Sequence, residues 1–532
     1  MASQKQKFFV RDATGLTRAL TATDALIGNL CTMGIGFSFL YVFFSALLYP
    51  GVNLPLTALF ALVPGILLSL VYYYFTVAMP RTGGDFVWTS RVFHPAIGFL
   101  VSFYITFTGL TILGTVAGWV PVYGLGPMFA ALAISNNDPS LLNLATTVSS
   151  PPTSFIIGVV LVSLFVLPLL LRSKSTFRVL WLLFIITVIG SVVTVAAFFS
   201  TPNSVFVTNF NQLSGMNYAS AISKAGLAPG FTLTMTLTGS IFTMLDFIGF
   251  NFSAYYAGEV KKGERSQLIA MIGAVIIFAI FLGIIFYSAN YSAGSDFINA
   301  LSYLSGSGSS AYTLGAPPEL NYLVVFANPS PWVVILSGLS FIATCLALIT
   351  VQSFWVVRNF FAWSFDRILP AWFVKMDSRR NSPYIAVIAT WILGIIFAAL
   401  FIYTVFFQYL VFSVINYFVA FGVTALAAVW FPYRRKDIFD ASPSIVKKKV
   451  GNVPVMSIVG VAGFLISAFL AYATIQPAVT PPPTGPPLVQ ALAYAFVPLT
   501  GVFALLIYAL AYITRKREGF DMSLAFKELP PE

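Results

Sequence analysis

Long apolar runs, separated by short polar stretches, recur along nearly the whole chain of 532 residues. A helix of about 20 predominantly apolar residues is long enough to cross the hydrocarbon core of a bilayer. The pattern predicts an all-α polytopic membrane protein without a separate soluble domain. Its twelve transmembrane helices are expected at 22–48, 54–79, 98–126, 154–171, 177–200, 232–258, 268–290, 332–357, 384–404, 409–432, 454–475 and 488–513.

Composition and charge support this topology. Hydrophobic residues make up 58% and charged residues 8% of the chain, against about 45–50% and 25% in soluble domains. If the N-terminus is cytoplasmic, 27 of the 28 Lys and Arg residues fall on the cytoplasmic side and only Lys224 lies outside. Basic residues concentrate in cytoplasmic loops, so we expect a multi-pass protein of the cell membrane with both termini cytoplasmic. The net charge of +11 is then explained by basic residues that set the orientation of the protein in the membrane. Nucleic acid is not an expected partner.

Two of the predicted spans are interrupted by glycine near their middle. The first contains Gly34 and Gly36, and the second contains Gly249. Glycine also lets membrane helices pack closely. Gly-interrupted segments at corresponding places in two halves of a chain, however, indicate a transporter binding site. The freed backbone groups of such a break must be satisfied by protein or by a watery cavity.

A broken helix presents N–H groups at one half-helix and C=O groups at the other. The first attract a carboxylate and the second attract a cation. We therefore expect Gly34, Ile35 and Gly36 to receive a carboxylate, and the backbone from Leu245 to Ile248 to receive an ammonium. Two such breaks side by side suit a zwitterion, as in a free amino acid.

Asp246 is the acidic residue that we place near mid-membrane. A carboxylate at that depth is costly unless it is paired, hydrated or protonated, so it is a candidate functional group. It could pair with a substrate ammonium or carry a coupling proton. The structural alternative is that Asp246 caps the second half-helix by accepting N–H bonds.

Four stretches resemble the amino acid–polyamine–organocation superfamily of permeases, over nearly the whole chain. The first is the glycine motif of the first span, and the second is the loop between spans two and three. The third covers the sixth span with its following loop, and the fourth is the exit of span eight. In order, they are 33–37; 80–88 with Arg91, His94 and Pro95; 247–250 with 257–262; and Arg358 with 366–370, Ser382 and Pro383.

The resemblance implies a leucine-transporter-type core of 5+5 inverted repeats with discontinuous first and sixth helices. It also implies that Gly34, Ile35 and Gly36 hold the substrate carboxylate, and that Leu245, Asp246, Phe247, Ile248 and Gly249 surround the amino group. The expected organisation is a cytoplasmic tail (1–21), first repeat (22–200), extracellular loop (201–231), second repeat (232–432), cytoplasmic loop (433–453), two peripheral spans (454–513) and a cytoplasmic tail (514–532).

Two departures from the family pattern bear on the coupling ion. Asn251 stands where many members have an acid, and span five lacks the Lys that stands in for sodium in some proton-coupled members. We expect coupling to H+, with Na+ as the open alternative. Ser340 and Thr344 in span eight are candidates for holding such an ion, although hydroxyl residues also commonly pack membrane helices.

These features predict a secondary active transporter of amino acids, working as a proton-coupled symporter or an exchanger by alternating access. A carrier of polyamines or organic cations with the same fold is the alternative within the class, and Asp246 favours it. A channel or a transport-like membrane sensor is the alternative from another class, but no repeated filter, charged pore ring or output domain is evident. We expect a small-molecule substrate, either an amino acid or an amine, and the lipid bilayer as surroundings. No enzymatic activity, catalytic residue, cofactor or metal site is expected.

Overall fold

The computed structural model describes residues 19–170, 173–374, 383–404, 407–482, 486–520, 522 and 526. Most of the expected tail 1–21 and the later part of the tail 514–532 lie outside the described residues, as do Arg172, Ser382 and Pro483.

The twelve predicted spans are confirmed in the described part of the chain. Four of them are interrupted within the span by 3-10 or π-helical turns, and a fifth ends in one; both kinds of turn are labelled η. In chain order the spans are α1 (Ala22–Met33), η1 (Ile35–Phe37) and α2 (Ser38–Leu48); α3 (Leu54–Ala78); α5 (Pro95–Trp119), η2 (Val120–Leu125) and α6 (Gly126–Asn136); α8 (Pro151–Val166) and η3 (Leu167–Leu170); α9 (Ser173–Phe199); α12 (Leu233–Thr243), η4 (Met244–Phe247) and η5 (Phe252–Glu259); α13 (Gly263–Leu268), η6 (Ile269–Gly273) and α14 (Ala274–Ala293); α17 (Pro331–Phe365); α18 (Tyr384–Tyr403); α19 (Phe407–Arg434); α21 (Val455–Thr474); and α22 (Pro487–Arg517).

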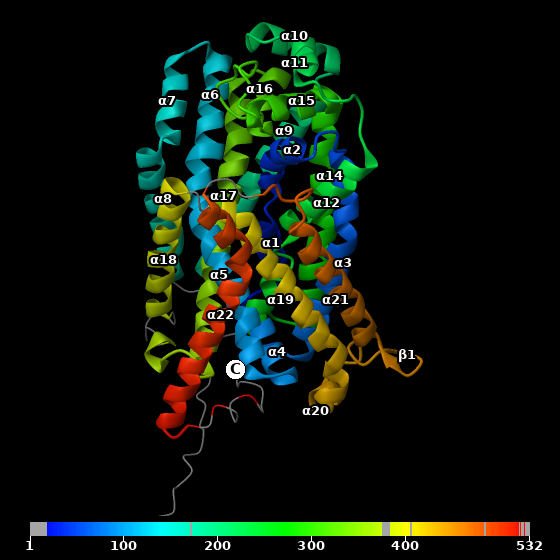
Figure 1. Ribbon diagram of the computed structural model, residues 1–532, viewed down its shortest axis with the longest axis vertical. Coiled ribbons are helices and arrows are strands. Elements are labelled where there is room, and N and C mark those ends of the chain that lie inside the picture. The colour runs from blue at the N-terminus through cyan, green and yellow to red at the C-terminus, as the bar shows by residue number, and fades with distance from the viewer. Residues whose placement is uncertain are drawn as a thin grey trace, which may run out of the picture.

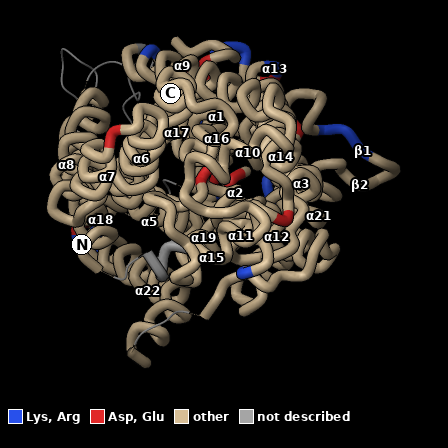
Figure 2. Tube along the Cα trace, turned by 90° about the horizontal axis from the view of Figure 1, so that it is seen from above, with Lys and Arg blue, Asp and Glu red and all other residues tan. Residues whose placement is uncertain are grey.

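Shorter elements lie at the two ends of this bundle (Figure 1). We call the end with α10 and α11 the far end, and the end with α4 and α20 the basic end, which we predict to be cytoplasmic. Figure 2 looks along the bundle and shows that Lys and Arg occupy only a few short segments of the tube. The short elements are α4 (Asp85–Val92), α7 (Ser140–Ser149), α10 (Asn203–Leu213), α11 (Tyr218–Ala225), α15 (Ser295–Gly306), α16 (Leu320–Ala327), η7 (Ala371–Val374) and α20 (Lys436–Ala441).

One small element departs from the all-helical expectation. β1 (Lys449–Val450) and β2 (Val453–Pro454) form an antiparallel hairpin in the loop 433–453. Gly451 adopts a φ of +59° in its turn, a conformation that glycine reaches without steric cost. The hairpin extends from the basic end (Figure 1) and leaves the helical core unchanged.

The core of the bundle is organised around α17, which packs against α9, α5 and α1. A helix that is apolar on all sides is stable only when neighbours surround it, and the inner half of α17 is buried nearly continuously from Ala343 to Ser364, apart from Leu346. By contrast, α22 leaves Leu510 66% exposed, as suits a helix that faces lipid. The two interrupted spans, through α1 and η5, therefore pack against this buried helix.

Candidate functional site

The first span breaks at the predicted glycines. Helix α1 ends at Met33, because Gly34 adopts the left-handed φ of +79° and ψ of 77°. One turn of 3-10 helix follows, and α2 begins at Ser38. The backbone is therefore unwound in the middle of the span.

The sixth span breaks at the same depth, directly beside the first. Helix α12 ends at Thr243, Ile248 is extended, and Gly249 has a φ of +134°. A Cβ atom on Gly249 would lie 2.8 Å from the backbone N of Met33, so only glycine permits this approach. The two breaks are thus in contact.

Asn29 of α1 connects the two broken spans through hydrogen bonds near this contact. Its amide donates hydrogen bonds to the carbonyl oxygens of Phe250 at 2.6 Å and Ala270 at 2.8 Å. Its Oδ1 accepts one from the backbone N–H of Ser253 at 2.8 Å. Backbone groups freed by the sixth-span break are in this way satisfied by a side chain of the first span, as a break inside a membrane requires.

A cavity of about 380 Å³ opens beside the two breaks. Aromatic and aliphatic side chains form most of its wall, with a few polar groups. The cavity extends toward the loop after α21, which contributes Val479 and Pro481 to its wall. Its lining includes Thr32, Met33, Phe37, Tyr41, Phe44, Trp119, Phe242, Leu245, Asp246, Ile248, Gln352, Tyr417, Val479 and Pro481.

Only part of the predicted site lines this cavity. Leu245, Asp246 and Ile248 do, whereas Phe247 and Gly249 lie behind the wall. Around the break in the first span, the cavity is lined by Thr32, Met33 and Phe37 rather than by residues 34–36.

Gly36 faces α17 instead of the cavity. Its N–H donates to the Thr344 hydroxyl at 3.1 Å, and a side chain at Gly36 would collide with Thr344 and the Ser340 carbonyl. The requirement for glycine at this position is therefore explained by close packing of the first span on α17.

Among the described residues that line the cavity, Asp246 is the charged one. Its side chain is buried, with 4% of the residue exposed, and Oδ2 has no hydrogen-bond partner within the described residues. The following helix, η5, is capped at Asn251 without any side-chain bond. The capping bond expected under the structural alternative is absent from the described part of the chain.

Ser340 and Thr344 belong to a hydroxyl cluster between α17 and α9. The Ser340 hydroxyl donates to the carbonyl of Thr187 at 2.8 Å and lies 2.9 Å from the Ser191 hydroxyl. The Thr344 hydroxyl bonds to the Ser340 carbonyl at 2.9 Å. These contacts account for both side chains as interhelical hydrogen bonds, and the ion-site hypothesis has no further support in the described residues.

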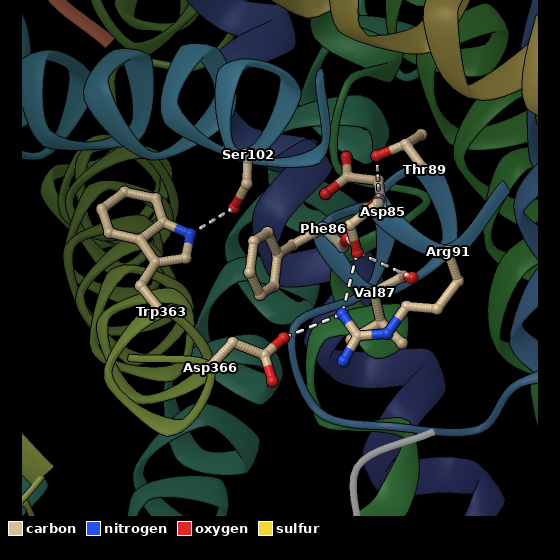
Figure 3. A network of polar contacts seen from close by, with 9 residues as sticks. Asp85, Phe86, Val87, Thr89, Arg91, Ser102, Trp363 and Asp366 are labelled. Atoms are coloured by element: carbon tan, nitrogen blue, oxygen red, sulfur yellow. Dashed lines mark hydrogen bonds and ion pairs between the residues drawn. The ribbon is translucent and has the colours of Figure 1, made fainter. Parts of the chain in front are cut away.

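Two buried ion pairs close the basic end. Arg91 at the end of α4 lies 2.8 Å from Asp366 after α17, with both side chains at most 2% exposed (Figure 3). Arg358 of α17 lies 2.8 Å from Glu259 at the end of η5. These pairs join α17 and the residue that follows it to α4 and to the sixth span at the basic end.

Two carboxyl groups that the structure buries were not identified from the sequence. Asp85 begins α4 at the basic end, and Glu319 precedes α16 at the far end, both with no exposed surface. Burial raises the pKa of Asp85 to about 7 and the pKa of Glu319 well above its ordinary value. Asp85 belongs to the stretch 80–88 that resembles the family, and this resemblance could have identified it as a candidate. Nothing in the sequence around Glu319 distinguishes it from a surface acid.

Comparison with known proteins identifies one family. The sequence profile described as amino acid permease matches residues 20–503, which is nearly all of the chain. No curated protein matches the sequence.

Proposed function

The chain belongs to the amino acid permease family, a family of membrane transporters, and we propose that it moves amino acids by proton-coupled symport or by exchange. Transport proceeds by alternating access around the cavity at the two helix breaks. The observation that carries this proposal is the unpaired, buried Asp246 in the wall of a cavity at two touching breaks.

In this proposal the substrate ammonium pairs with Asp246 and with carbonyl groups near Leu245. A buried carboxylate without a partner is costly, so a cationic group that supplies the missing charge and hydrogen bonds is bound strongly. The substrate carboxylate lies toward the unwound backbone after Met33, where a half-helix start favours an anion. The aromatic rings around the cavity accept the substrate side chain.

Alternating access requires that the cavity open to each side of the membrane in turn. The form described here is closed at the basic end by the Arg91–Asp366 and Arg358–Glu259 pairs. The cavity instead reaches toward the loop at Val479 and Pro481. We assign this conformation to the part of the cycle that faces the far end, which the distribution of basic residues predicts to be outside.

A carrier of polyamines or other organic cations is a second candidate. The described part of the cavity wall contains no Lys, Arg or His, so the charge of that wall is that of Asp246. Tyr41, Trp119 and Tyr417 add aromatic faces that attract cations. A net cation therefore suits this wall electrostatically at least as well as a zwitterion.

The test is uptake by the purified protein in liposomes under an imposed pH gradient, acidic outside. We expect labelled amino acids to accumulate above their external concentration and to be released when a protonophore collapses the gradient. A matched panel of diamines and monoamines decides between the two candidates. Transport of none of these compounds, with or without substrate inside the vesicles, would contradict the proposal.

A further inference from the structure

The carboxyl group of Asp85 is surrounded by tyrosine hydroxyl groups at the basic end. Oδ2 accepts hydrogen bonds from the Tyr72 hydroxyl of α3 at 2.9 Å and from the Tyr255 hydroxyl of η5 at 3.1 Å. Oδ1 is buried and has no hydrogen-bond partner within the described residues. The carboxyl group therefore joins three elements that meet where the bundle is closed.

The backbone of the loop before α4 fits these surroundings closely. Gly83 and Gly84 have φ values of +105° and +49°, and the Gly83 N–H donates to the Tyr255 carbonyl at 3.2 Å. A Cβ atom at Gly84 would lie 3.2 Å from the Tyr255 ring. Asp85 is thus held against the sixth span by the shape of its own loop.

A row of three aromatic rings, those of Tyr417, Trp355 and Tyr255, leads from the cavity to Asp85. Tyr417 lines the cavity, and its ring lies 5.9 Å from that of Trp355. Trp355 is stacked on Tyr255 at 4.6 Å, and Tyr255 bonds to Asp85. Asn251, four residues after the break at Phe247, donates to the Tyr255 hydroxyl at 3.3 Å. The carboxyl group is therefore connected to the broken sixth helix by two hydrogen bonds.

Among the residues that the structure describes, the Asp85 carboxyl is surrounded by hydroxyl groups and has no cationic partner. Tyr72 and Tyr255 are the titratable groups that face it, and from α19 the nearby polar side chain is that of Thr424, beside Tyr72. Arg91, on the same helix, is turned toward Asp366 and away from the Asp85 carboxyl (Figure 3). Burial raises the pKa of Asp85 to about 7, although the two tyrosine hydrogen bonds lower it.

We propose that Asp85 is a proton-binding site of the transport cycle, loaded while the basic end is closed and emptied to the water there when that end opens. Loading takes a proton from water that enters the cavity and places it on the carboxylate. On release the O–H bond breaks, the carboxylate keeps the electron pair, and water at the basic end takes the proton. The proposal rests on the proton coupling proposed above and names the group that carries it.

The direction of the coupling follows from linkage. A carboxyl group with a raised pKa in the closed form binds its proton more tightly there than when water surrounds it. Relative to an ordinary carboxyl of pKa 3.8, a value of about 7 corresponds to about a thousandfold tighter binding. Protonation therefore favours the form closed at the basic end as the pH falls below about 7, and deprotonation favours opening.

The experiment measures substrate exchange and pH-gradient-driven uptake in liposomes as a function of pH. Asp85→Asn keeps the shape of the group and mimics its neutral state. We expect it to retain exchange, without the wild-type inflection near pH 7, and to lose accumulation driven by the gradient. An unchanged pH profile and unchanged accumulation in Asp85→Asn would overturn the proposal.

A second variant keeps the test decisive if Asp85→Asn is poorly folded. Tyr255→Phe removes a hydrogen bond that lowers the pKa of Asp85, so the inflection should move to higher pH. The matched control is Tyr104→Phe, whose hydroxyl donates to the Val497 carbonyl on the outer side of α5; its profile should equal that of the wild type. An inflection that Tyr255→Phe leaves in place would contradict the assignment.

The two proposals fail in different ways. If uptake by the wild-type protein does not respond to an imposed pH gradient, proton coupling is contradicted, and the proposed role of Asp85 is contradicted with it. If the pH gradient drives uptake by the wild type and by Asp85→Asn equally well, only the proposed proton site at Asp85 is overturned. Substrate affinity should be unchanged in Asp85→Asn, because Asp85 does not line the cavity.

Discussion

Replacing Asp246 by Asn removes the charge of the cavity wall while keeping the size of the side chain. Asp246 is buried and its Oδ2 has no hydrogen-bond partner within the described residues, so the change removes no hydrogen bond from this oxygen. If the carboxylate pairs with a substrate ammonium, the variant loses one charge-assisted contact. Such a contact contributes about 1.5–3 kcal/mol, which corresponds to a loss of roughly 10- to 150-fold in affinity.

The assay is equilibrium binding of a labelled substrate to purified protein, followed by exchange in liposomes without a pH gradient. Asp138→Asn is the matched control, because Asp138 is a partly exposed acid in the loop before α7, outside the cavity wall. Weakened binding in both assays supports ammonium pairing. Normal binding and pH-independent exchange, with loss of gradient-driven uptake, would instead assign the coupling proton to Asp246. Wild-type behaviour in every assay would refute a functional role for this residue.

Three further predictions test the topology, the packing of the break and the closed end. A cysteine at Ser307 should react with an impermeant reagent added to intact cells, and a cysteine at Lys448 should not; the reverse pattern would overturn the orientation. Gly36→Val should lower the thermal stability in detergent by about 1–3 kcal/mol, because its side chain would overlap Thr344 of α17, and an unchanged melting temperature would contradict this packing. Asp366→Asn should remove the carboxylate charge that faces Arg91, at a cost of about 3–5 kcal/mol to the closed form, and should therefore increase reagent access from the basic end; unchanged access would show that the pair does not hold that end closed.

The sequence predicted the elements that depend on local composition. Twelve spans follow from apolar runs, and the breaks at Gly34 and Gly249 follow from glycines that permit positive φ. The sequence could not assign which residues of an unwound segment face the cavity, since that depends on the path of the chain after Met33. The cavity is consequently lined by Thr32, Met33 and Phe37.

The acidic residues differ in how far local sequence indicates their burial. Asp246 was identified because it interrupts an apolar run, and the structure places it in the cavity wall. Asp85 and Glu319 lie between spans, where acids are ordinarily solvated. Their burial results from contacts with residues far away in the chain, such as Tyr255 against Asp85. Such tertiary burial leaves no periodic signal in the sequence.

A structure of the protein with a bound substrate tests the central claim most directly. The account predicts density for an amino acid in the cavity beside the two breaks, with its ammonium within hydrogen-bond distance of the Asp246 carboxylate and its carboxylate toward the backbone after Met33. The aromatic wall formed by Trp119 and Phe242 should surround the side chain. Substrate bound elsewhere in the bundle, with the Asp246 cavity empty, would contradict the account.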